Sequence, residues 1–333
     1  MYITVLGRKL FVPLIKSSPS ILSSCLILQI LHIVEALGLL FTSFGVAVIV
    51  RDLNRMSRFH TNLTRIVQAF FLCFYIGLAG RIVILIYQFG MLDVEENTTH
   101  SILLLIGSTL RVWFTNAGGA LLPSMIIERA FASKYISDYE KVARPWIYFM
   151  IILLANILPL YFSITETLGF YTFETIAITT AVIIGASALV YTYLFRRDFV
   201  KLREINRGDG KNSMVRYTLS IKFQLKENLR VMKLLMYLSI IDALITAIIC
   251  PFFILATVIF DEQSPWAHVC YQVVDVFVIL SVDVLVIFFL RTLGISSRWL
   301  KIFMFLKPAP TTLTDEHKGA AQQYFNQLTA AWK

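Results

Sequence analysis

Seven long apolar segments, separated by polar connectors, set the pattern of this chain. They lie at about 21–50, 66–91, 102–127, 146–165, 173–195, 231–260 and 269–290. Each has about 20 residues or more, enough for a helix to cross a hydrocarbon core of about 30 Å. A helix satisfies its backbone hydrogen bonds within one such segment, so it is the structure expected inside a membrane. The pattern predicts an all-α membrane protein, a seven-transmembrane helix bundle over 21–291.

Basic residues fall almost entirely on one side of the predicted bundle. The connectors 51–65, 128–145 and 196–233 carry four, four and eleven Lys or Arg, and the segment from Arg291 carries six. The loops 92–101, 166–172 and 261–268 carry none. Lys and Arg are retained on the cytoplasmic side, so we expect an extracellular N-terminal segment, 1–20, and a cytoplasmic C-terminal segment, 292–333. Three basic residues of the first segment (Arg8, Lys9 and Lys16) point the other way, but the four in 51–65 outnumber them.

Composition agrees with a membrane protein. Hydrophobic residues make up 57% of the chain and charged residues 15%, against about 25% charged in soluble domains. The net charge of +9 comes from the inner connectors, where anionic lipid attracts it, and does not indicate nucleic-acid binding. The triplet at Asn97, in the first outer loop, is a glycosylation candidate, whereas the triplet at Asn62 lies on the inner side. We expect no structural disulfide among the four cysteines.

The common catalytic motifs are missing from the sequence. There is no HExxH, GxSxG, Gly-rich phosphate loop or CxxC pair. His32 lies one turn from Glu35, but one His-x-x-Glu does not supply the ligands of a metal site. We therefore expect no enzyme, no metal and no cofactor. A receptor, a channel or transporter, and a structural membrane protein remain, although seven segments do not divide into the related halves of many transporters.

An acidic–basic pair, Glu128-Arg129, ends the third apolar segment. In many seven-helix receptors such a pair holds the resting state until the Arg is freed to meet a G protein. The alternative is that the pair only marks the membrane boundary.

Four basic residues before the sixth segment share one helical face, at i, i+4, i+8 and i+11. They are Lys222, Lys226, Arg230 and Lys233. This basic stripe would meet an acidic partner surface or lipid headgroups, and the alternative is an ordinary solvated face.

A short amphipathic segment follows the seventh apolar run and ends before Pro308. Its apolar face consists of Trp299, Ile302, Phe303 and Leu306. Arg298 and Lys301 lie on another face, which is the pattern of a helix lying in the membrane interface. We therefore expect a short interfacial eighth helix.

Two stretches of the chain resemble signatures of a known family. Residues Glu128 to Lys141, ERAFASKYISDYEK, resemble the inner end of helix three in nematode serpentine receptors of class epsilon (Sre). Residues Tyr217 to Arg230, YTLSIKFQLKENLR, resemble that family's second signature, before helix six. The resemblance implies a GPCR-like fold and a chemosensory G-protein-coupled receptor in the plasma membrane of sensory neurons. The implied partners are a small chemical ligand, a heterotrimeric G protein and the lipid bilayer.

The chain departs from rhodopsin-like receptors at three places. No cysteine stands near Ser101, at the outer end of the third segment. The seventh segment contains no proline and hence no NPxxY motif, and Pro251 in the sixth is not accompanied by a preceding Trp. Activation details of that larger family are therefore not transferred, although Pro251 would still kink the sixth helix.

Four ionisable residues lie at matching depths inside the apolar segments, about four helical turns from the expected inner ends. They are Glu35, Arg81, Arg111 and Asp275. At 1.5 Å per residue, this layer lies about 23 Å from the cytoplasmic boundary. An unpaired charge in a membrane costs about 2.5–3.5 kcal/mol, so such residues face the bundle interior and pair. We expect one pair between Glu35 and Arg81 and another between Arg111 and Asp275.

Two roles for this charge layer remain open. It would either floor an outward-opening pocket, with Arg111 or Asp275 meeting a polar ligand, or only hold the helices in register. Asp242 and Asp283 lie deeper, with no basic residue at matching depth, and are hydrogen-bonded, protonated or near a cation. The prediction is a chemoreceptor in which an outer ligand moves helix six and activates a G protein. A ligand-gated channel or transporter is the alternative.

Overall fold

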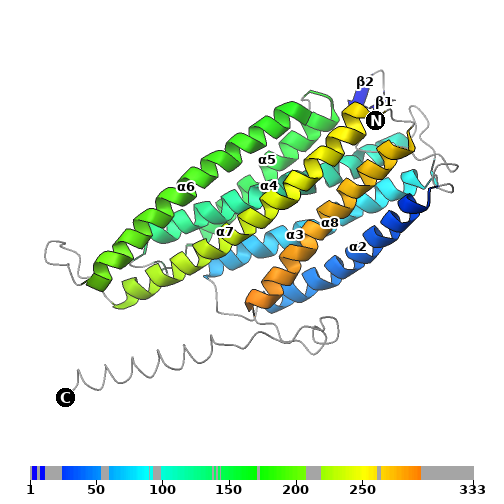
Figure 1. Ribbon diagram of the computed structural model, residues 1–333. Helices are drawn as coiled ribbons and strands as arrows, with labels where there is room; N and C mark the ends of the chain where they lie inside the picture. Colours follow the sequence, from blue (N-terminus) through cyan, green and yellow to red (C-terminus); the bar gives the residue numbers. More distant parts are fainter. Residues whose placement is uncertain are drawn as a thin grey trace, which may run out of the picture. The chain divides into compact units, whose positions relative to one another are not determined.

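A computed structural model describes residues 2–5, 8–11, 25–53, 60–89, 91–92, 99–136, 139, 142, 144–170, 173–207, 219–260 and 264–293. Its helices in the described part are α2 (Leu26–Leu53), α3 (Thr61–Gln88), α4 (Thr99–Lys134), α5 (Pro145–Thr167), α6 (Phe173–Arg207), α7 (Leu219–Ile254) and α8 (Pro265–Leu293). A π-helical turn, Leu255–Ile259, ends α7. The fold is the expected seven-helix bundle (Figure 1). The expected interfacial helix and the glycosylation candidate Asn97 lie outside the described residues.

A small hairpin precedes the bundle, which the hydrophobic pattern did not predict. Strand β1 (Tyr2–Val5) pairs antiparallel with β2 (Arg8–Phe11). Both strands are only four residues long, too short to give a clear alternation signal, although β-branched and aromatic residues favour them. Leu10 is buried against Ile84, Tyr87 and Leu104, so the hairpin is attached to α3 and α4 by apolar contact.

Six of the seven helices are long and apolar enough to cross a membrane, and α4 falls short of that apolarity among the described residues. The reason is its position, because α4 packs against α3, α5, α6 and α7. Figure 1 shows α4 passing between α5 and α3. Polar side chains on such a helix meet protein rather than lipid, so its sequence can be less apolar than that of its neighbours.

Two helices extend well beyond their apolar segments. Helix α6 continues to Arg207, past the expected end at 195, and α7 begins at Leu219, before the expected start at 231. Each extension amounts to about three helical turns. Hydropathy detects only the part of a helix that meets lipid, whereas these extensions are amphipathic. The basic stripe therefore belongs to the same continuous helix as the sixth apolar segment.

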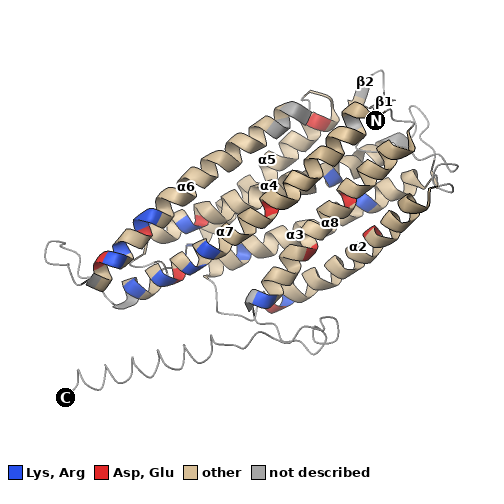
Figure 2. Cartoon of the chain, in the orientation of Figure 1, with Lys and Arg blue, Asp and Glu red and all other residues tan. Residues whose placement is uncertain are grey.

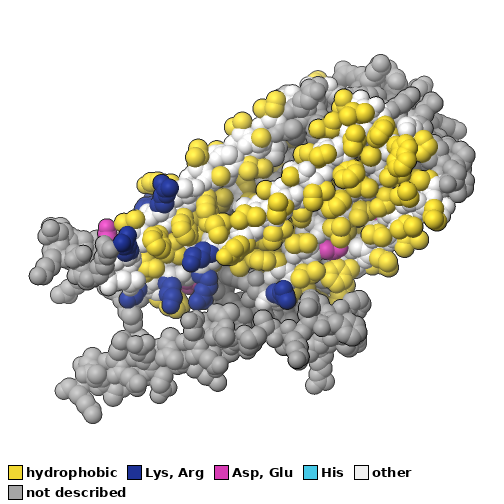
Figure 3. Space-filling view, viewed as in Figure 1, with side chains coloured by type: hydrophobic (Ala, Val, Ile, Leu, Met, Phe, Trp, Pro, Cys, Tyr) yellow, Lys and Arg dark blue, Asp and Glu magenta, His cyan; other side chains and the backbone are white. Residues whose placement is uncertain are grey.

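Charged residues divide the bundle into two ends. Lys and Arg gather where α2, α4, α6 and α8 end and α7 begins, which we call the basic end (Figure 2). The space-filling view in Figure 3 shows apolar side chains covering most of the visible face, with the basic residues confined to that end. The distribution is the one expected when an apolar belt crosses a membrane between a basic surface and the opposite end.

The packing differs between the two sides of the bundle. In their most apolar windows, 39% of α2 and 50% of α8 are buried, but only 6% of α6 and of α7. Glycines permit close approach around α2, α3 and α8. A Cβ at Gly45 of α2 would lie 2.4 Å from Val286 Cγ1 of α8, and one at Gly77 of α3 would lie 2.4 Å from Phe114 Cγ of α4. We call α2, α3 and α8 the closed side, and α6 and α7 the open side.

Candidate functional site

The charge layer forms one connected network across four helices. Arg81 of α3 binds Glu35 of α2 through two contacts, Nε–Oε1 at 2.5 Å and Nη2–Oε2 at 2.9 Å. Arg111 of α4 donates to Asp275 of α8, with Nη2 at 2.9 Å from Oδ1. Both expected ion pairs are therefore present. A third contact, between Arg81 Nη1 and Asp275 Oδ2 at 3.0 Å, joins them.

Neutral polar side chains complete this network. Gln272, one turn before Asp275 on α8, donates a hydrogen bond to Glu35 and accepts one from Arg81 at 3.4 Å. Gln88 of α3 lies 3.5 Å from the same Gln272 oxygen, at the limit of a hydrogen bond. His32 Nδ1 lies 3.6 Å from the Glu35 carboxylate. Neither glutamine was predicted from the sequence, although amides one or two turns from buried charges are a usable signal.

The charge layer is closed to solvent. Its four residues are between 1% and 7% exposed, and each side chain is bound to another member of the network. With two positive and two negative groups, the network neutralises itself. Its geometry binds α2, α3, α4 and α8 together, and a ligand role for these residues stays a prediction.

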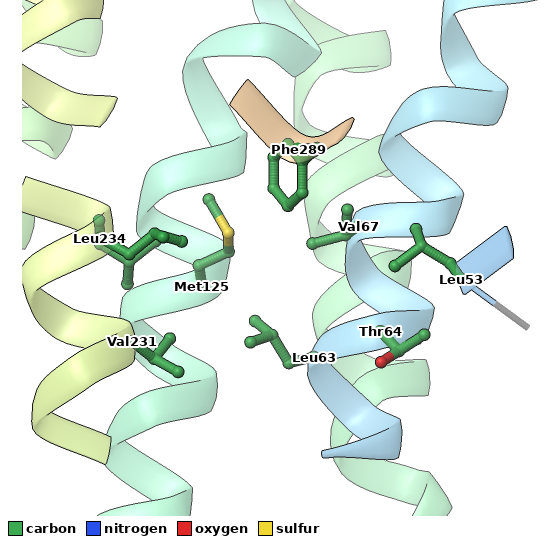
Figure 4. A pocket seen from close by; sticks show the side chains of 9 residues that line it. Leu53, Leu63, Thr64, Val67, Met125, Val231, Leu234 and Phe289 are labelled. Atoms are coloured by element: carbon green, nitrogen blue, oxygen red, sulfur yellow. The ribbon is translucent and has the colours of Figure 1, made fainter. Parts of the chain in front are cut away.

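Neither of the two cavities identified among the described residues borders this layer. The first, of about 10 Å³, has room for about one water molecule. Its lining comes from α2, α3, α4, α7 and α8 near the basic end, and all the side chains except Thr64 are apolar (Figure 4). The second, of about 20 Å³, lies between α3, α4 and α5. Both are too small for an organic ligand.

A second polar network lies at the basic end, around Glu128 and Arg129 of α4. The Arg129 guanidinium binds the Glu128 carboxylate with contacts of 2.5 and 2.7 Å. Its third nitrogen, Nη1, donates to Asn228 Oδ1 of α7 at 3.3 Å. Glu128 is 0% and Arg129 4% exposed, so both members of the pair are buried. Arg129 is therefore held both by the neighbouring carboxylate and by the helix of the sixth apolar segment.

Asp198 of α6 extends this second network. It is fully buried and accepts hydrogen bonds from Ser133 at 2.6 and 2.7 Å and from Asn228 at 2.7 Å, with Arg197 Nε at 3.2 Å. The network thus joins α4, α6 and α7. Asp198 was not predicted because the fifth apolar segment was expected to end at 195, whereas α6 continues to Arg207.

Tyr139, between α4 and α5, covers the other side of Glu128. Its hydroxyl donates to Glu128 Oε1 at 2.7 Å and accepts from Asn62 Nδ2 of α3 at 2.9 Å. Burial, together with the neighbouring carboxylate, raises the pKa of Tyr139, so the phenol stays protonated and able to donate. Asn62, which the sequence analysis placed on the inner side, is therefore a buried structural residue.

The basic stripe has the opposite environment. Its four residues, Lys222, Lys226, Arg230 and Lys233, are all exposed on α7. Leu225 and Leu229 of the same helix are buried, so α7 presents an apolar face to the bundle and the stripe to its surroundings. The six residues predicted to face a G protein therefore divide into four exposed cations and one buried pair.

The two deeper aspartates also differ from each other. Asp283 of α8 is buried and accepts a hydrogen bond from Thr42 of α2, which is one of the alternatives left open for it. Asp242 of α7 is exposed and has no hydrogen-bond or ion-pair partner among the described residues.

Comparison with known proteins identifies the class of this bundle. The family described as "Sre G protein-coupled chemoreceptor" matches residues 19–333, which is nearly the whole chain. The chain therefore belongs to the Sre family, a serpentine chemoreceptor family of multi-pass membrane proteins.

Two Caenorhabditis elegans relatives place the chain within class epsilon. Serpentine receptor class epsilon-1 is 32% identical over 196 residues, and this match covers 54% of the chain but only about half, 51%, of that relative. Serpentine receptor class epsilon-38 is 26% identical over 348 residues, covering 89% of the chain and 90% of the relative. The resemblance expected from the two stretches around Arg129 and Asn228 is confirmed at the level of the family.

Proposed function

We propose that this chain is a chemosensory G-protein-coupled receptor of the plasma membrane. It binds a small chemical ligand from outside and activates a heterotrimeric G protein at its basic end. The family membership and the seven-helix bundle support this class. The charge distribution supports an orientation with the N-terminus outside and the C-terminus in the cytoplasm. By relation to the family, a sensory neuron is the expected site of expression.

The buried Arg129 is the observation that carries the proposal. It lies at the junction of three helices, bound to Glu128 of α4 and to Asn228 of α7, which in turn holds Asp198 of α6. A buried guanidinium with several acceptors is stable only while those acceptors stay in place. A displacement of α7 at the basic end breaks the Arg129–Asn228 contact, so the cation and the space beside it become available to a partner.

The basic stripe supplies the second part of the proposed interface. Its four exposed cations lie on α7, the helix whose movement would release Arg129. Clustered charges attract an oppositely charged surface and speed its association. We assign this stripe to an acidic surface of the G protein, with anionic lipid headgroups as competing partners.

Ligand-independent signalling tests the release step without requiring a known ligand. The receptor is expressed with a chimeric Gα reporter, and basal signalling is normalised to the amount at the cell surface. Asn228→Ala should raise basal signalling several-fold, because Arg129 loses its contact with α7. Arg129→Ala should abolish signalling, including in the Asn228→Ala background. Glu204→Ala, which alters an exposed residue of α6, is the matched control and should leave the signal unchanged.

The opposite pattern would reject this function. If Asn228→Ala signals like the wild type while Arg129→Ala retains a normal response, the junction does not control a G protein. Ligand-evoked current in membranes lacking any G protein would instead support the channel alternative. Protease accessibility tests the orientation separately: residues 208–218 and the C-terminal segment should be cleaved from the same, cytoplasmic side.

A further inference from the structure

Asp242 is an exception among the aspartates of α6, α7 and α8. The other three have partners: Asp198 binds Ser133 and Asn228, Asp275 binds two arginines, and Asp283 binds Thr42. Asp242 has no hydrogen-bond or ion-pair partner among the described residues, although it lies within the apolar part of α7. An ionisable residue at such depth that no protein group neutralises marks a path or site for a ligand or ion.

The direction of Asp242 follows from the buried face of α7. Toward the basic end, that face includes Asn228, Leu235 and Leu238. Asp242 lies four residues after Leu238 and seven after Leu235, which are helical spacings that return to the same side. It therefore continues the face that contacts α4 and α6, not the opposite face that carries exposed Ile240. Yet Asp242 is exposed, and no described α7 side chain between Leu238 and Ala256 is buried.

The contact between Arg129 and Asn228 shows which residues of α4 and α7 lie at the same height. Helices α4 and α7 run in opposite directions and touch at that point, where the two side chains are 3.3 Å apart. Asp242 lies as far beyond Asn228 in the sequence as Thr115 lies before Arg129. At 1.5 Å per residue, both are about 21 Å from the contact, a distance of nearly four helical turns. Thr115 and Asp242 therefore lie at the same height on facing sides.

The facing part of α4 also contains exposed positions. Along the face that begins with buried Arg129 and Ile126, Leu122 is half-buried and Thr115 is exposed, although α4 is the central helix. A Cβ placed on Gly118, one turn toward the basic end from Thr115, would meet no atom within 4 Å. Thr115 and Asp242 are thus both exposed at the same height, although a Cβ on the neighbouring Gly119 would lie 3.7 Å from Thr180 Cγ2 of α6. Thr115 lies about one turn toward the basic end from Arg111, whose charge is already used by Asp275.

We propose that α4 and α7 enclose a cleft at this height, and that this cleft is a binding site for a small ligand that carries a protonated amine on an apolar body. Asp242 is its counter-ion, and the Thr115–Gly118 surface of α4 receives the body. An unpaired carboxylate between apolar helices is best neutralised by a cation that brings its own hydrophobic surface. The proposal deepens the proposed function, on which it rests for its physiological role, by moving the ligand contact away from the closed charge layer to α7, the helix that holds Arg129.

Thiol labelling in membranes tests the cleft without any G protein. Cysteine is placed at position 115 (Thr115→Cys) in a background where Cys25 and Cys250 are alanine. It is then labelled with cationic 2-aminoethyl methanethiosulfonate or the anionic 2-sulfonatoethyl reagent. We expect labelling, and the cationic reagent should react at least about tenfold faster than the anionic one, because a carboxylate lies across the cleft. Asp242→Asn should reduce that preference by about tenfold. Ile240→Cys, on the lipid side of α7, is the control and should stay largely unlabelled.

Several outcomes would overturn the proposal. An unlabelled Thr115→Cys variant means that there is no accessible cleft, and this holds even if Asp242→Asn fails to fold. A charge preference that Asp242→Asn does not change means that Asp242 does not face position 115. Protection of the thiol is then compared between a panel of alkylamines and their isosteric alcohols. If no amine protects better than its alcohol, the site does not select a cationic ligand.

The labelling and the signalling results separate the two proposals. A cleft with the expected charge preference, in a protein whose Arg129 and Asn228 variants leave the reporter unchanged, would reject the G-protein function and keep the site. Altered signalling in those variants without any labelling at position 115 would keep the receptor function and reject this site.

Discussion

The closed side and the open side of this bundle treat buried charge differently. On the closed side, α2, α3 and α8 pack closely, and their carboxylates are bound by arginine, glutamine or threonine. On the open side, α6 and α7 are held to α4 by the network at the basic end, and Asp242 further along α7 is unpaired among the described residues. The comparison indicates a division between a fixed frame and a pair of helices free to respond.

The physical reason is that the two sides differ in the free-energy cost of moving their helices. Separating the helices of the closed side would leave buried charges without partners, so the closed side resists movement. Helices that bury little surface in the membrane lose little when they shift. Movement of α6 and α7 then requires that the polar contacts around Arg129 and Asp198 exchange partners and that α7 shifts against α8, with which it also packs. The following variants test this division, in order of decreasing expected effect.

Arg81→Ala should be the most damaging of these changes. It removes the group that binds both Glu35 and Asp275, so Glu35 loses its arginine partner and Asp275 keeps only its contact with Arg111. Breaking a buried pair in this way costs about 3–5 kcal/mol. Purified protein should unfold at a much lower temperature, which can be followed by fluorophore labelling of buried Cys73 and Cys270. Arg51→Ala, at an exposed arginine of α2, is the matched control and should have little effect. If both variants lower the unfolding temperature equally, the charge layer contributes no more to stability than an exposed arginine does.

Exchanging Arg111 and Asp275 is a more specific probe of the same network. The double variant Arg111→Asp, Asp275→Arg restores one pair but also places a second cation against Arg81. It should therefore recover little of the stability lost by the single changes. Full recovery would show that the Arg81–Asp275 contact is not important.

Asp198→Ala should have the next largest effect, on the attachment of the open side. Ser133, Asn228 and Arg197 would lose a shared buried acceptor, at a cost of about 1–3 kcal/mol in the free energy of unfolding. Accessibility of a cysteine introduced on the buried part of α7 should rise as that helix loosens. Glu204→Ala, at an exposed carboxylate of the same helix, serves for comparison. An unchanged α7 in the Asp198 variant would contradict this attachment.

Gly77→Ala and Gly185→Ala compare the two sides with the same substitution. A Cβ at Gly77 would lie 2.4 Å from Phe114 Cγ, so α3 and α4 must move apart, and overpacking of this kind costs about 1–3 kcal/mol. At Gly185 on α6 a Cβ meets nothing within 4 Å, and alanine adds up to about 1 kcal/mol of helix propensity. Melting temperatures should move in opposite directions, and a similar loss at both positions would mean that α6 is packed as closely as α3.

Asp242→Asn should have the smallest effect on stability. The residue has no partner to lose among the described residues, so the free energy of unfolding should change by less than about 0.5 kcal/mol. Asp275→Asn, which weakens contacts with Arg81 and Arg111, should be clearly destabilising in the same thermal assay. If Asp242→Asn is as destabilising as Asp275→Asn, Asp242 has a structural partner and the open side is not open at that height.

Depth along the membrane could be predicted from the sequence, because each residue of a helix advances by a fixed rise. Counting from the expected inner ends placed Glu35, Arg81, Arg111 and Asp275 in one layer, and the structure brings them together. The family could be predicted from the two stretches around Arg129 and Asn228, since they occur in the expected order and places.

Helix ends and lateral partners were harder to predict. The expected apolar segments end where lipid contact ends, so the amphipathic continuation of α6 was read as a connector, and Asp198 was overlooked. The continuation of α7 was signalled by the helical spacing of its basic residues. The bond from Arg81 to Asp275 was not expected either, because two separate pairs already balanced the charges. The hairpin of β1 and β2 had too few residues for a periodic signal.

The sequence alone determined that this chain forms a seven-helix membrane bundle, which end is basic, and how deep its charged residues lie. These properties depend on composition and on distance along a single helix. Only the tertiary structure decided that Arg81 has two carboxylate partners, that Asp198 joins the junction at Arg129, and that Asp242 has none among the described residues. Those properties depend on the rotation and spacing of neighbouring helices, which are set by close packing at residues such as Gly45 and Gly77.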